Sequence, residues 1–276
     1  LTMSRKETFI INAVRTPIGK FGGMLSSVRT DDLAAHAIRA LMDRHDFDPT
    51  EIDDVIMGCA NQAGEDNRNV ARMALLLAGL PFSVPGETVN RLCASGMSAV
   101  IHAHRAVQTG DGDIFIAGGV ENMTRGPWVI SKASKPFGRD SEMVDSSFGW
   151  RFINPVMRAQ YGVDSMPETA ENVATDYQVN REDQDRFALR SQANAARAQE
   201  DGTLAQEITA VTIPQKKGEA IVVSRDEHPR ATTMEALAKL KGVVRPDGTV
   251  TAGNASGVND GACALLLANE DAAKRF

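Results

Sequence analysis

Short apolar segments alternate with amphipathic ones through the first 120 residues, and this alternation restricts the possible folds more than any other feature. Four segments have the length and apolar content of strands, and three carry apolar side chains at helical spacing. The predicted strands cover residues 7–14, 54–58, 87–90 and 113–117, and the predicted helices cover residues 30–41, 69–78 and 94–109. Strands that are apolar on both faces belong in a sheet covered on both sides by helices. The sequence therefore predicts an α/β fold.

The character of the sequence changes between residues 120 and 250, where Pro, Gly and polar residues become frequent. Two helical segments, residues 168–178 and 181–200, interrupt the strand–helix alternation there. The apolar run at residues 262–268 returns to the earlier pattern and predicts a final strand of the first sheet. We therefore expect a core domain of residues 1–120 and 250–276, with residues 121–249 inserted as a loop domain.

The end of the sequence predicts the start of another helix, because Asn269 is a favourable N-cap and Glu270 and Asp271 suit a first turn. A helix of about two turns is not stable by itself, since isolated helices need roughly 12 residues or tertiary packing. We therefore expect the chain to be a fragment of a longer protein.

Charge and hydrophobicity exclude several classes of protein. The formal net charge is −6 and no block of Lys or Arg occurs, so we expect no nucleic-acid partner. The longest apolar run, residues 73–82, is half the roughly 20 residues that span a bilayer, so we expect no membrane association. Residues 1–9 lack the apolar core of a secretory signal, which favours a cytoplasmic location.

The three cysteines, Cys59, Cys93 and Cys263, lie far apart and form no C-x-x-C pair. Their odd number and spacing argue against a disulfide framework and against a zinc site. We therefore expect a reducing compartment, no metal and at most one working thiol.

The segment VNRLCASGMSAV, residues 89–100, places Cys93 between a predicted strand and a long predicted helix. N–H groups in the first turn of a helix are unpaired, and together with the helix dipole they stabilise a thiolate. The small residues 94–96 leave room for a substrate carbonyl beside the sulfur, where the same N–H groups can stabilise an oxyanion. The residues alone leave two interpretations open, a nucleophile and a small buried core cysteine.

Four segments in the same order resemble the thiolase family. They are VNRLCASGMSAV at 89–100, GGVENM at 118–123, MPETAENVA at 166–174 and TAGNASGVNDGA at 251–262. Residues 58–81 and 148–174 most resemble the β-ketoadipyl-CoA thiolases of aromatic catabolism. The resemblance implies the N-terminal half of a thiolase-like fold, a mixed sheet covered by helices with an inserted loop domain, and makes Cys93 the catalytic nucleophile.

The resemblance also implies a reaction in two steps. The Cys93 thiolate attacks the 3-oxo carbon of a 3-oxoacyl-CoA, acetyl-CoA leaves, and CoA then takes the acyl group from the sulfur. For 3-oxoadipyl-CoA the products would be succinyl-CoA and acetyl-CoA. Acyl-CoA and CoA are thus the expected partners, with CoA as substrate and no cofactor.

The histidines do not supply the acid or base that this reaction needs. His102 lies nine residues beyond Cys93, which is about 13 Å along the same helix. The G-H-P, N-E-A-F and C-x-G motifs, which thiolases carry in a second, similarly folded half, do not occur in this sequence. We therefore expect this chain alone to be inactive. The remaining histidines, His36, His45, His104 and His228, match no motif of the family.

Several residues are implied in binding the substrate. By motif match, Ser256 and Gly257 would contact the pantetheine arm and Met166 would line the acyl pocket; the alternatives are a turn serine and a core methionine. Arg230 and the group Lys239, Lys241 and Arg245 could neutralise the CoA phosphates, or form only a solvated face. Ser165 stands where many acetoacetyl-CoA thiolases carry a histidine, so a short acetoacetyl substrate is less favoured.

A dicarboxylate substrate also needs a cation for its distal carboxylate. Arg125, Arg151 and Arg158 are candidates, and the sequence does not choose among them. Glu121 follows a predicted strand at a position where α/β sheets often carry functional groups, but we expect it to be structural, as we do Cys59 and Cys263.

Two other functions stay open, a biosynthetic acetoacetyl-CoA thiolase and a non-catalytic acyl-CoA-binding module. A condensing enzyme such as a ketoacyl synthase is disfavoured, because the surroundings of its nucleophile differ from VNRLCASGM and because the turn NASGVNDGA resembles that of thiolases. As is usual for thiolases, we expect a homodimer or homotetramer at full length, with residues 124–150 as the tetramerisation region.

Overall fold

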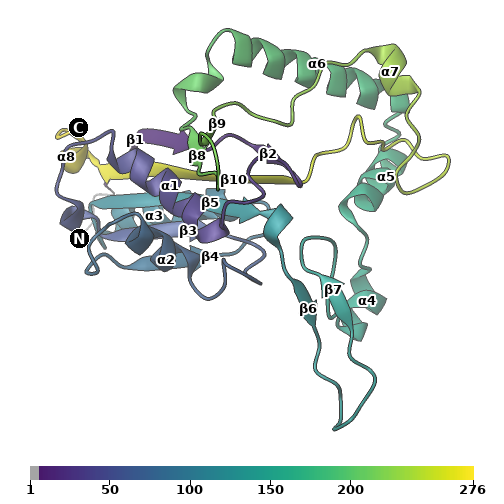
Figure 1. The fold of residues 1–276 in the computed structure, drawn as a ribbon, viewed down its shortest axis with the longest axis horizontal. Helices are drawn as coiled ribbons and strands as arrows, with labels where there is room; N and C mark the ends of the chain where they lie inside the picture. The colour runs from purple at the N-terminus through teal and green to yellow at the C-terminus, as the bar shows by residue number, and fades with distance from the viewer. Residues whose placement is uncertain (1–5) are drawn as a thin grey trace. The chain divides into compact units, whose positions relative to one another are not determined.

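The computed structural model describes residues 6–276, so the start of the segment assessed for a secretory signal lies outside the described residues. The chain divides into two compact units (Figure 1). The core unit contains residues 6–126, 204–227 and 259–276, and the loop unit contains residues 127–203 and 228–258.

The core unit is built on one mixed sheet with the strand order β1-β10-β5-β3-β4. β3 (Asp54–Gly58) lies parallel to both β4 (Gly86–Val89) and β5 (Ile114–Asn122). β10 (Asn259–Asn269) is antiparallel to β5 and to β1 (Thr8–Arg15), and it also pairs with the short β2 (Gly19–Lys20).

Helices cover both faces of this sheet (Figure 1), because its inner strands are apolar on both sides. α1 (Thr30–Met42) and α2 (Val70–Leu77) pack on one face, where they contact Val55, Met57 and Ile116. α3 (Ser95–Thr109) packs on the other face, through its Ala99, Ala103 and Val107, against Ile56 and Phe115. Neighbouring residues of β3 and of β5 thus enter opposite clusters, as the two-residue period of a strand requires.

Short elements complete the core unit. They are the 3-10 helices η1 (Pro49–Glu51), η2 (Met123–Arg125) and η3 (Leu204–Gln206), the hairpin of β8 (Val211–Ile213) and β9 (Ile221–Val223), and α8 (Glu270–Ala273). Asn269 caps α8 by accepting a hydrogen bond from the Ala272 N–H at 2.8 Å, as its position in the sequence predicts.

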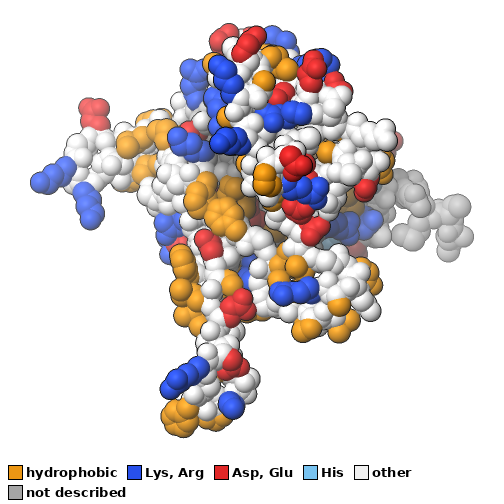
Figure 2. Space-filling view, turned by 90° about the vertical axis from the view of Figure 1, so that its right-hand side faces the viewer, with side chains coloured by type: hydrophobic (Ala, Val, Ile, Leu, Met, Phe, Trp, Pro, Cys, Tyr) orange, Lys and Arg blue, Asp and Glu red, His pale blue; other side chains and the backbone are white. Residues whose placement is uncertain are grey.

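The loop unit consists of a hairpin and four helices. β6 (Trp128–Ile130) pairs with β7 (Met143–Asp145), and the helices are α4 (Pro155–Tyr161), α5 (Met166–Asp176), α6 (Arg181–Glu200) and α7 (Met234–Ala238). Trp128 and Phe137 are exposed in the predicted tetramerisation region, and Figure 2 shows hydrophobic side chains open to solvent on the face in view. The oligomeric state stays a prediction.

The predicted α/β fold with a mixed sheet is confirmed, but the predicted domain boundaries are wrong in detail. β5 continues to Asn122, so the core unit extends to residue 126 rather than 120, and it resumes at residue 259 rather than 250. Residues 204–227, which we expected in the inserted domain, belong to the core unit.

Contacts with Arg15 explain why residues 204–227 return to the core unit. The Arg15 guanidinium forms ion pairs with Glu207 at 2.6 Å and with Asp226 at 2.7 Å. Val211 and Val223 of the hairpin enter the same apolar cluster as α1 and α2. The strands of this hairpin have three residues each, which is too short for a periodic signal in the sequence.

Among the helices of residues 6–276, none combines the length and the hydrophobicity that crossing a bilayer requires.

Candidate active site

Cys93 lies in a tight turn between the end of β4 at Val89 and the start of α3 at Ser95. Leu92, directly before it, has a φ of +50°, a left-handed conformation that costs a leucine about 1–3 kcal/mol. Hydrogen bonds hold this conformation. The Leu92 N–H donates to Asn90 Oδ1 at 2.9 Å, and Ser95 Oγ donates to the Leu92 carbonyl at 2.6 Å while accepting from the Arg91 N–H at 2.8 Å.

The first turn of α3 leaves backbone N–H groups available. Its N-cap residue, Ala94, has no side chain that could accept a hydrogen bond, so the positions that a cap usually satisfies stay open. Within the described chain, the N–H groups of Gly96 and Met97 have no backbone or side-chain acceptor. They can therefore stabilise negative charge on a substrate oxygen near the turn.

Glycines at the ends of two strands allow this helix turn to lie directly on the sheet. A Cβ atom on Gly58, the last residue of β3, would be 2.2 Å from the carbonyl carbon of Ser95. A Cβ atom on Gly119 of β5 would be 3.4 Å from the Gly96 Cα and 3.0 Å from the Gly58 carbonyl oxygen. The absence of side chains at Gly58 and Gly119 thus allows the Cys93 turn to lie close to the ends of β3 and β5.

The three cysteines, all within the described residues, lie in different environments. Cys93 is exposed, Cys263 in β10 is half-buried, and Cys59 at the end of β3 is buried. Cys59 Sγ donates to Asp66 Oδ2 at 3.4 Å, and burial, aided by the carboxylates of Glu121 and Asp66, raises the pKa of its thiol far above the usual value. Burial also raises the pKa of Cys263. Neither is suited to be a nucleophile at neutral pH.

Cys59, Asp66 and Glu121 place donor atoms within 4.8 Å of one another, a set that could hold a metal ion by its chemistry. Their carboxylates are already bound by backbone N–H groups. Glu121 accepts from Ala60 at 2.9 Å and from Asn61 at 3.1 Å, and Asp66 accepts from Gln62 at 3.1 Å and from Gly64 at 2.9 Å. The cluster therefore serves to hold the loop that follows β3.

The two histidines of α3 contact side chains of the strands β4 and β1. His102 Nδ1 is 3.8 Å from Glu87 Oε1, and His104 Nδ1 shares a hydrogen bond with Thr8 Oγ1 at 2.9 Å. Burial lowers the pKa of His36 and of His45. These surroundings agree with the expectation that they are ordinary structural residues.

The predicted substrate-binding residues Met166, Ser256, Gly257 and Arg230 all lie in the loop unit and are exposed. The predicted nucleophile Cys93 lies in the core unit and is exposed as well. Met166 is the first residue of α5, whose N-cap Ser165 accepts a hydrogen bond from the Glu168 N–H at 3.4 Å.

The turn that contains Ser256 and Gly257 is fixed from within the loop unit. Asn254 Nδ2 donates to Asp185 Oδ1 of α6 at 2.9 Å, and Asn254 Oδ1 accepts from the Thr251 N–H at 2.7 Å. A Cβ atom on Gly257 would be 1.9 Å from the His228 ring, so a side chain at this position would have to displace that ring. The sequence did not single out Asn254 or Asp185.

Arg230 and Arg245 are already bound to groups of the loop unit. Arg230 Nη2 donates to the Ala252 carbonyl at 2.6 Å, and Arg245 pairs with Glu168 and donates to Asn172 Oδ1 at 2.7 Å. The ion pair leaves Arg245 less suited to a CoA phosphate than the exposed Lys239 and Lys241.

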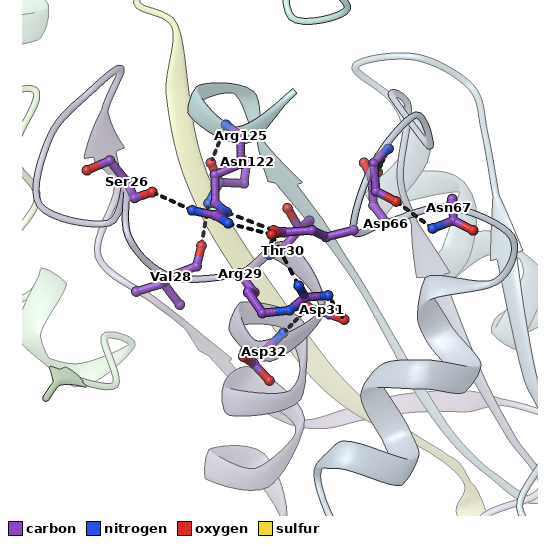
Figure 3. A network of polar contacts seen from close by, with 12 residues as sticks. Ser26, Val28, Arg29, Thr30, Asp31, Asp32, Asp66, Asn67, Asn122 and Arg125 are labelled. Carbon is purple, nitrogen blue, oxygen red and sulfur yellow. Dashed lines mark hydrogen bonds and ion pairs between the residues drawn. The ribbon is translucent and has the colours of Figure 1, made fainter. Parts of the chain in front are cut away.

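Arg125, one of the three arginines that could bind the distal carboxylate of a substrate, forms an ion pair with Glu65 within the core unit (Figure 3). Its Nε donates to Glu65 at 2.8 Å, and the same carboxylate accepts from Arg29 at 3.4 Å and from the Thr30 N–H at 3.1 Å. The hydrogen bond from Arg125 holds the pKa of Glu65 below its usual value. In the loop unit, Arg151 donates to the Ser146 carbonyl at 3.2 Å, and Arg158 is exposed.

The family described as "Thiolase, N-terminal domain" matches residues 8–271. The chain belongs to the thiolase family.

Relatives of this thiolase chain agree with the assignment. This chain is 63% identical over 275 residues to a protein of Pseudomonas knackmussii named beta-ketoadipyl-CoA thiolase. The alignment covers 99% of this chain and 68% of that protein. A solved structure of the Bacillus anthracis acetyl-CoA acetyltransferase matches with a TM-score of 0.89 and 39% identity, covering 99% of this chain and 68% of that one. A structure of human mitochondrial 3-ketoacyl-CoA thiolase in complex with CoA matches with a TM-score of 0.86 and 33% identity, covering 98% and 66%.

Proposed function

We propose that the protein cleaves 3-oxoadipyl-CoA with CoA into succinyl-CoA and acetyl-CoA, and that Cys93 is the nucleophile. The observation that carries the proposal is the exposed Cys93 in the strained turn before α3, in a thiolase chain 63% identical to a beta-ketoadipyl-CoA thiolase. The substrate named for that relative supports the choice of 3-oxoadipyl-CoA.

In the first step, Cys93 Sγ bonds to the 3-oxo carbon of the substrate, and the bond between carbons 2 and 3 breaks. The electron pair leaves as the enolate of acetyl-CoA, which takes a proton, and the enzyme keeps a succinyl thioester. In the second step, the CoA thiolate attacks this thioester and releases Cys93. Each step places negative charge on a carbonyl oxygen, and the open N–H groups of Gly96 and Met97 are the candidate donors to it.

The CoA part of the substrate is assigned to the loop unit. Ser256 and Gly257 would contact pantetheine, Met166 would line the acyl pocket, and Arg230 would face the phosphates. The CoA complex of the human relative supports a CoA site on this fold. We also propose a cytoplasmic homodimer or homotetramer.

Mass spectrometry of the trapped intermediate tests this proposal. The complete gene product that contains this chain is mixed with 3-oxoadipyl-CoA in the absence of free CoA, quenched in acid and digested. We expect a succinyl group on the peptide that carries Cys93, no such group in Cys93→Ala, and the wild-type amount in the matched control Cys263→Ala.

Steady-state rates separate the proposal from its alternatives. We expect 3-oxoadipyl-CoA to give a higher kcat/KM than acetoacetyl-CoA. The reverse preference would support an acetoacetyl-CoA thiolase instead. Binding of acyl-CoA without a labelled peptide and without turnover would overturn the catalytic role and leave an acyl-CoA-binding module.

A further inference from the structure

Glu121 occupies a place in the core unit that the proposed chemistry does not use. It lies near the end of β5, and its two carboxylate oxygens accept hydrogen bonds from consecutive backbone N–H groups, those of Ala60 at 2.9 Å and Asn61 at 3.1 Å. Burial raises the pKa of this carboxyl, so its position there has an energetic cost that the two hydrogen bonds offset. Glu121 thus fixes the backbone directly after β3.

The backbone that Glu121 holds is connected to the Cys93 turn. The Ala60 carbonyl accepts a hydrogen bond from Asn90 Nδ2 at 3.0 Å, and Asn90 Oδ1 accepts from the Leu92 N–H at 2.9 Å. Leu92 is the residue with a φ of +50°, directly before Cys93. A continuous series of hydrogen bonds therefore runs from Glu121 through Ala60 and Asn90 to the strained residue.

We propose that Glu121 and Asn90 are positioning residues of the acyl-transfer reaction, which set the orientation of Cys93 through Ala60 and Leu92. This inference rests on the proposed function. The left-handed conformation of Leu92 is unfavourable by itself, so it persists only while its surroundings hold it. Asn90 supplies the side-chain acceptor for the Leu92 N–H, and Glu121 fixes the segment that receives the Asn90 amide.

A metal-binding role for the same carboxylate is less well supported. All four carboxylate oxygen atoms of Glu121 and Asp66 accept backbone N–H groups, and Cys59 Sγ donates to Asp66. A cation would have to displace these donors and expose them without partners in a buried loop.

Two single variants of the complete gene product, their double variant and a control variant test the positioning role. Glu121→Gln replaces one acceptor oxygen by an NH2 group that cannot accept a backbone N–H, and Asn90→Ala removes both links to the turn. The matched control is Asp53→Asn. Asp53 Oδ2 accepts two consecutive N–H groups at the other end of β5, from Asp113 at 2.6 Å and Ile114 at 3.0 Å, without a connection to Cys93.

We expect kcat to fall about 10- to 100-fold in Glu121→Gln and in Asn90→Ala, with KM within about twofold, because small misplacements of a reacting group cost this much. The rate of Cys93 alkylation by iodoacetamide should change in the same two variants. Asp53→Asn should keep kcat, KM and alkylation rate within about twofold, even where its melting temperature falls. The double variant should lose no more than the stronger single variant, because both residues act on one turn.

The outcomes separate this inference from the proposed function. If the wild-type protein forms no acyl-enzyme, the function fails, while the alkylation rates still test the positioning of Cys93. If the wild type is active and Glu121→Gln matches Asp53→Asn in kcat and in alkylation, the positioning role is wrong. The positioning role is also wrong if Glu121→Gln and Asp53→Asn have equal melting temperatures and Glu121→Gln loses no more kcat than Asp53→Asn.

Discussion

The ends of β3 and β4 carry a cysteine each and lie side by side, with Gly58 opposite Val89 in a parallel pairing, yet their surroundings are opposite. Cys59 follows β3 directly, is buried, and is hydrogen-bonded to the carboxylate of Asp66. Cys93 lies four residues beyond Val89, is exposed, and precedes a helix turn with open N–H groups.

The difference shows that the position of a thiol at a strand end does not make it a nucleophile. Carboxylates and burial oppose ionisation of Cys59, whereas access and N–H donors favour reaction at Cys93. The number of residues between the strand end and the cysteine decides the outcome, because Cys59 follows β3 without an intervening residue whereas three residues separate Cys93 from β4. Beyond β4, they form a turn that projects the side chain away from the core.

The largest expected effect is the loss of acyl transfer when Cys93, but not Cys59, is replaced by alanine. We expect Cys93→Ala to lower kcat about 10³-fold or more, because no other group takes over a nucleophile. Cys59→Ala should keep kcat within about threefold. Steady-state assays of the complete gene product with 3-oxoadipyl-CoA measure both. Equal losses of kcat in Cys93→Ala and Cys59→Ala would contradict the claim that only the cysteine beyond β4 is the nucleophile.

Selective alkylation gives the next largest effect. At pH 8 in the native protein, Cys93 should react with iodoacetamide about 100-fold faster than Cys59, because the pKa of Cys59 is raised and its sulfur is buried. Peptide mapping after timed quenching gives the two rates. In urea the ratio should approach one. Fast labelling of Cys59 in the folded state would contradict the burial of its sulfur.

The close packing of the Cys93 turn on the sheet can be tested at Gly58. We expect Gly58→Ala to lower the free energy of unfolding by about 2 kcal/mol, because its Cβ would meet the Ser95 backbone at 2.2 Å. Gly96→Ala is the matched control, since its Cβ would have no neighbour nearer than 3.7 Å and alanine favours a helix. Urea denaturation measures both. A Gly58→Ala protein as stable as Gly96→Ala would show that the contact is not tight.

The smallest expected effect is a change in the free energy of unfolding when the ion pair between Arg125 and Glu65 is removed. This ion pair supports the loop after β3, whereas hydrogen bonds between neutral groups hold the Cys93 turn. The hydrogen bond from Arg125 lowers the pKa of Glu65 below its usual 4.5, so its contribution is present above pH 4.5 and is lost as the pH falls through the lowered value. After allowance for solvent screening, we expect Glu65→Gln to cost about 1 kcal/mol at pH 7.

Denaturation curves at several pH values check this prediction. The difference between the wild type and Glu65→Gln should shrink below pH 4.5 as the wild-type carboxylate is protonated. Asp48→Asn serves as a control for an exposed carboxylate that caps a 3-10 helix through the Thr50 N–H, and we expect a smaller dependence on pH for it than for Glu65→Gln. A difference that is constant from pH 7 to pH 3 would contradict the role of the ion pair.

Elements with a long periodic pattern were predicted well. Residues 181–200 were expected to form a helix and do so as α6, and the helix expected at 94–109 begins at Ser95. Shorter elements gave weaker signals. The strand expected at 113–117 continues as β5 to Asn122, because pairing with β10 extends it through glycines that have low strand propensity.

Parts of the candidate site could not be found from sequence alone. The motif led to Cys93, but the positive φ of Leu92 follows from no local signal, since leucine is not a residue that favours it. The hydrogen bonds from Glu121 to residues 60 and 61 join positions about 60 apart in the sequence, and periodicity carries no information on such contacts.

Residue types and their spacing are enough to give the α/β alternation, the glycines that permit close packing, and a cysteine ahead of a helix without a capping side chain. These properties depend on local residue types and their spacing. Long-range packing is needed to bring residues 204–227 back to the core unit, to pair Arg125 with Glu65, and to bury Cys59 while Cys93 stays exposed. Burial and long-range pairing depend on which distant segments meet, and that choice minimises the free energy of the whole chain rather than of any one segment.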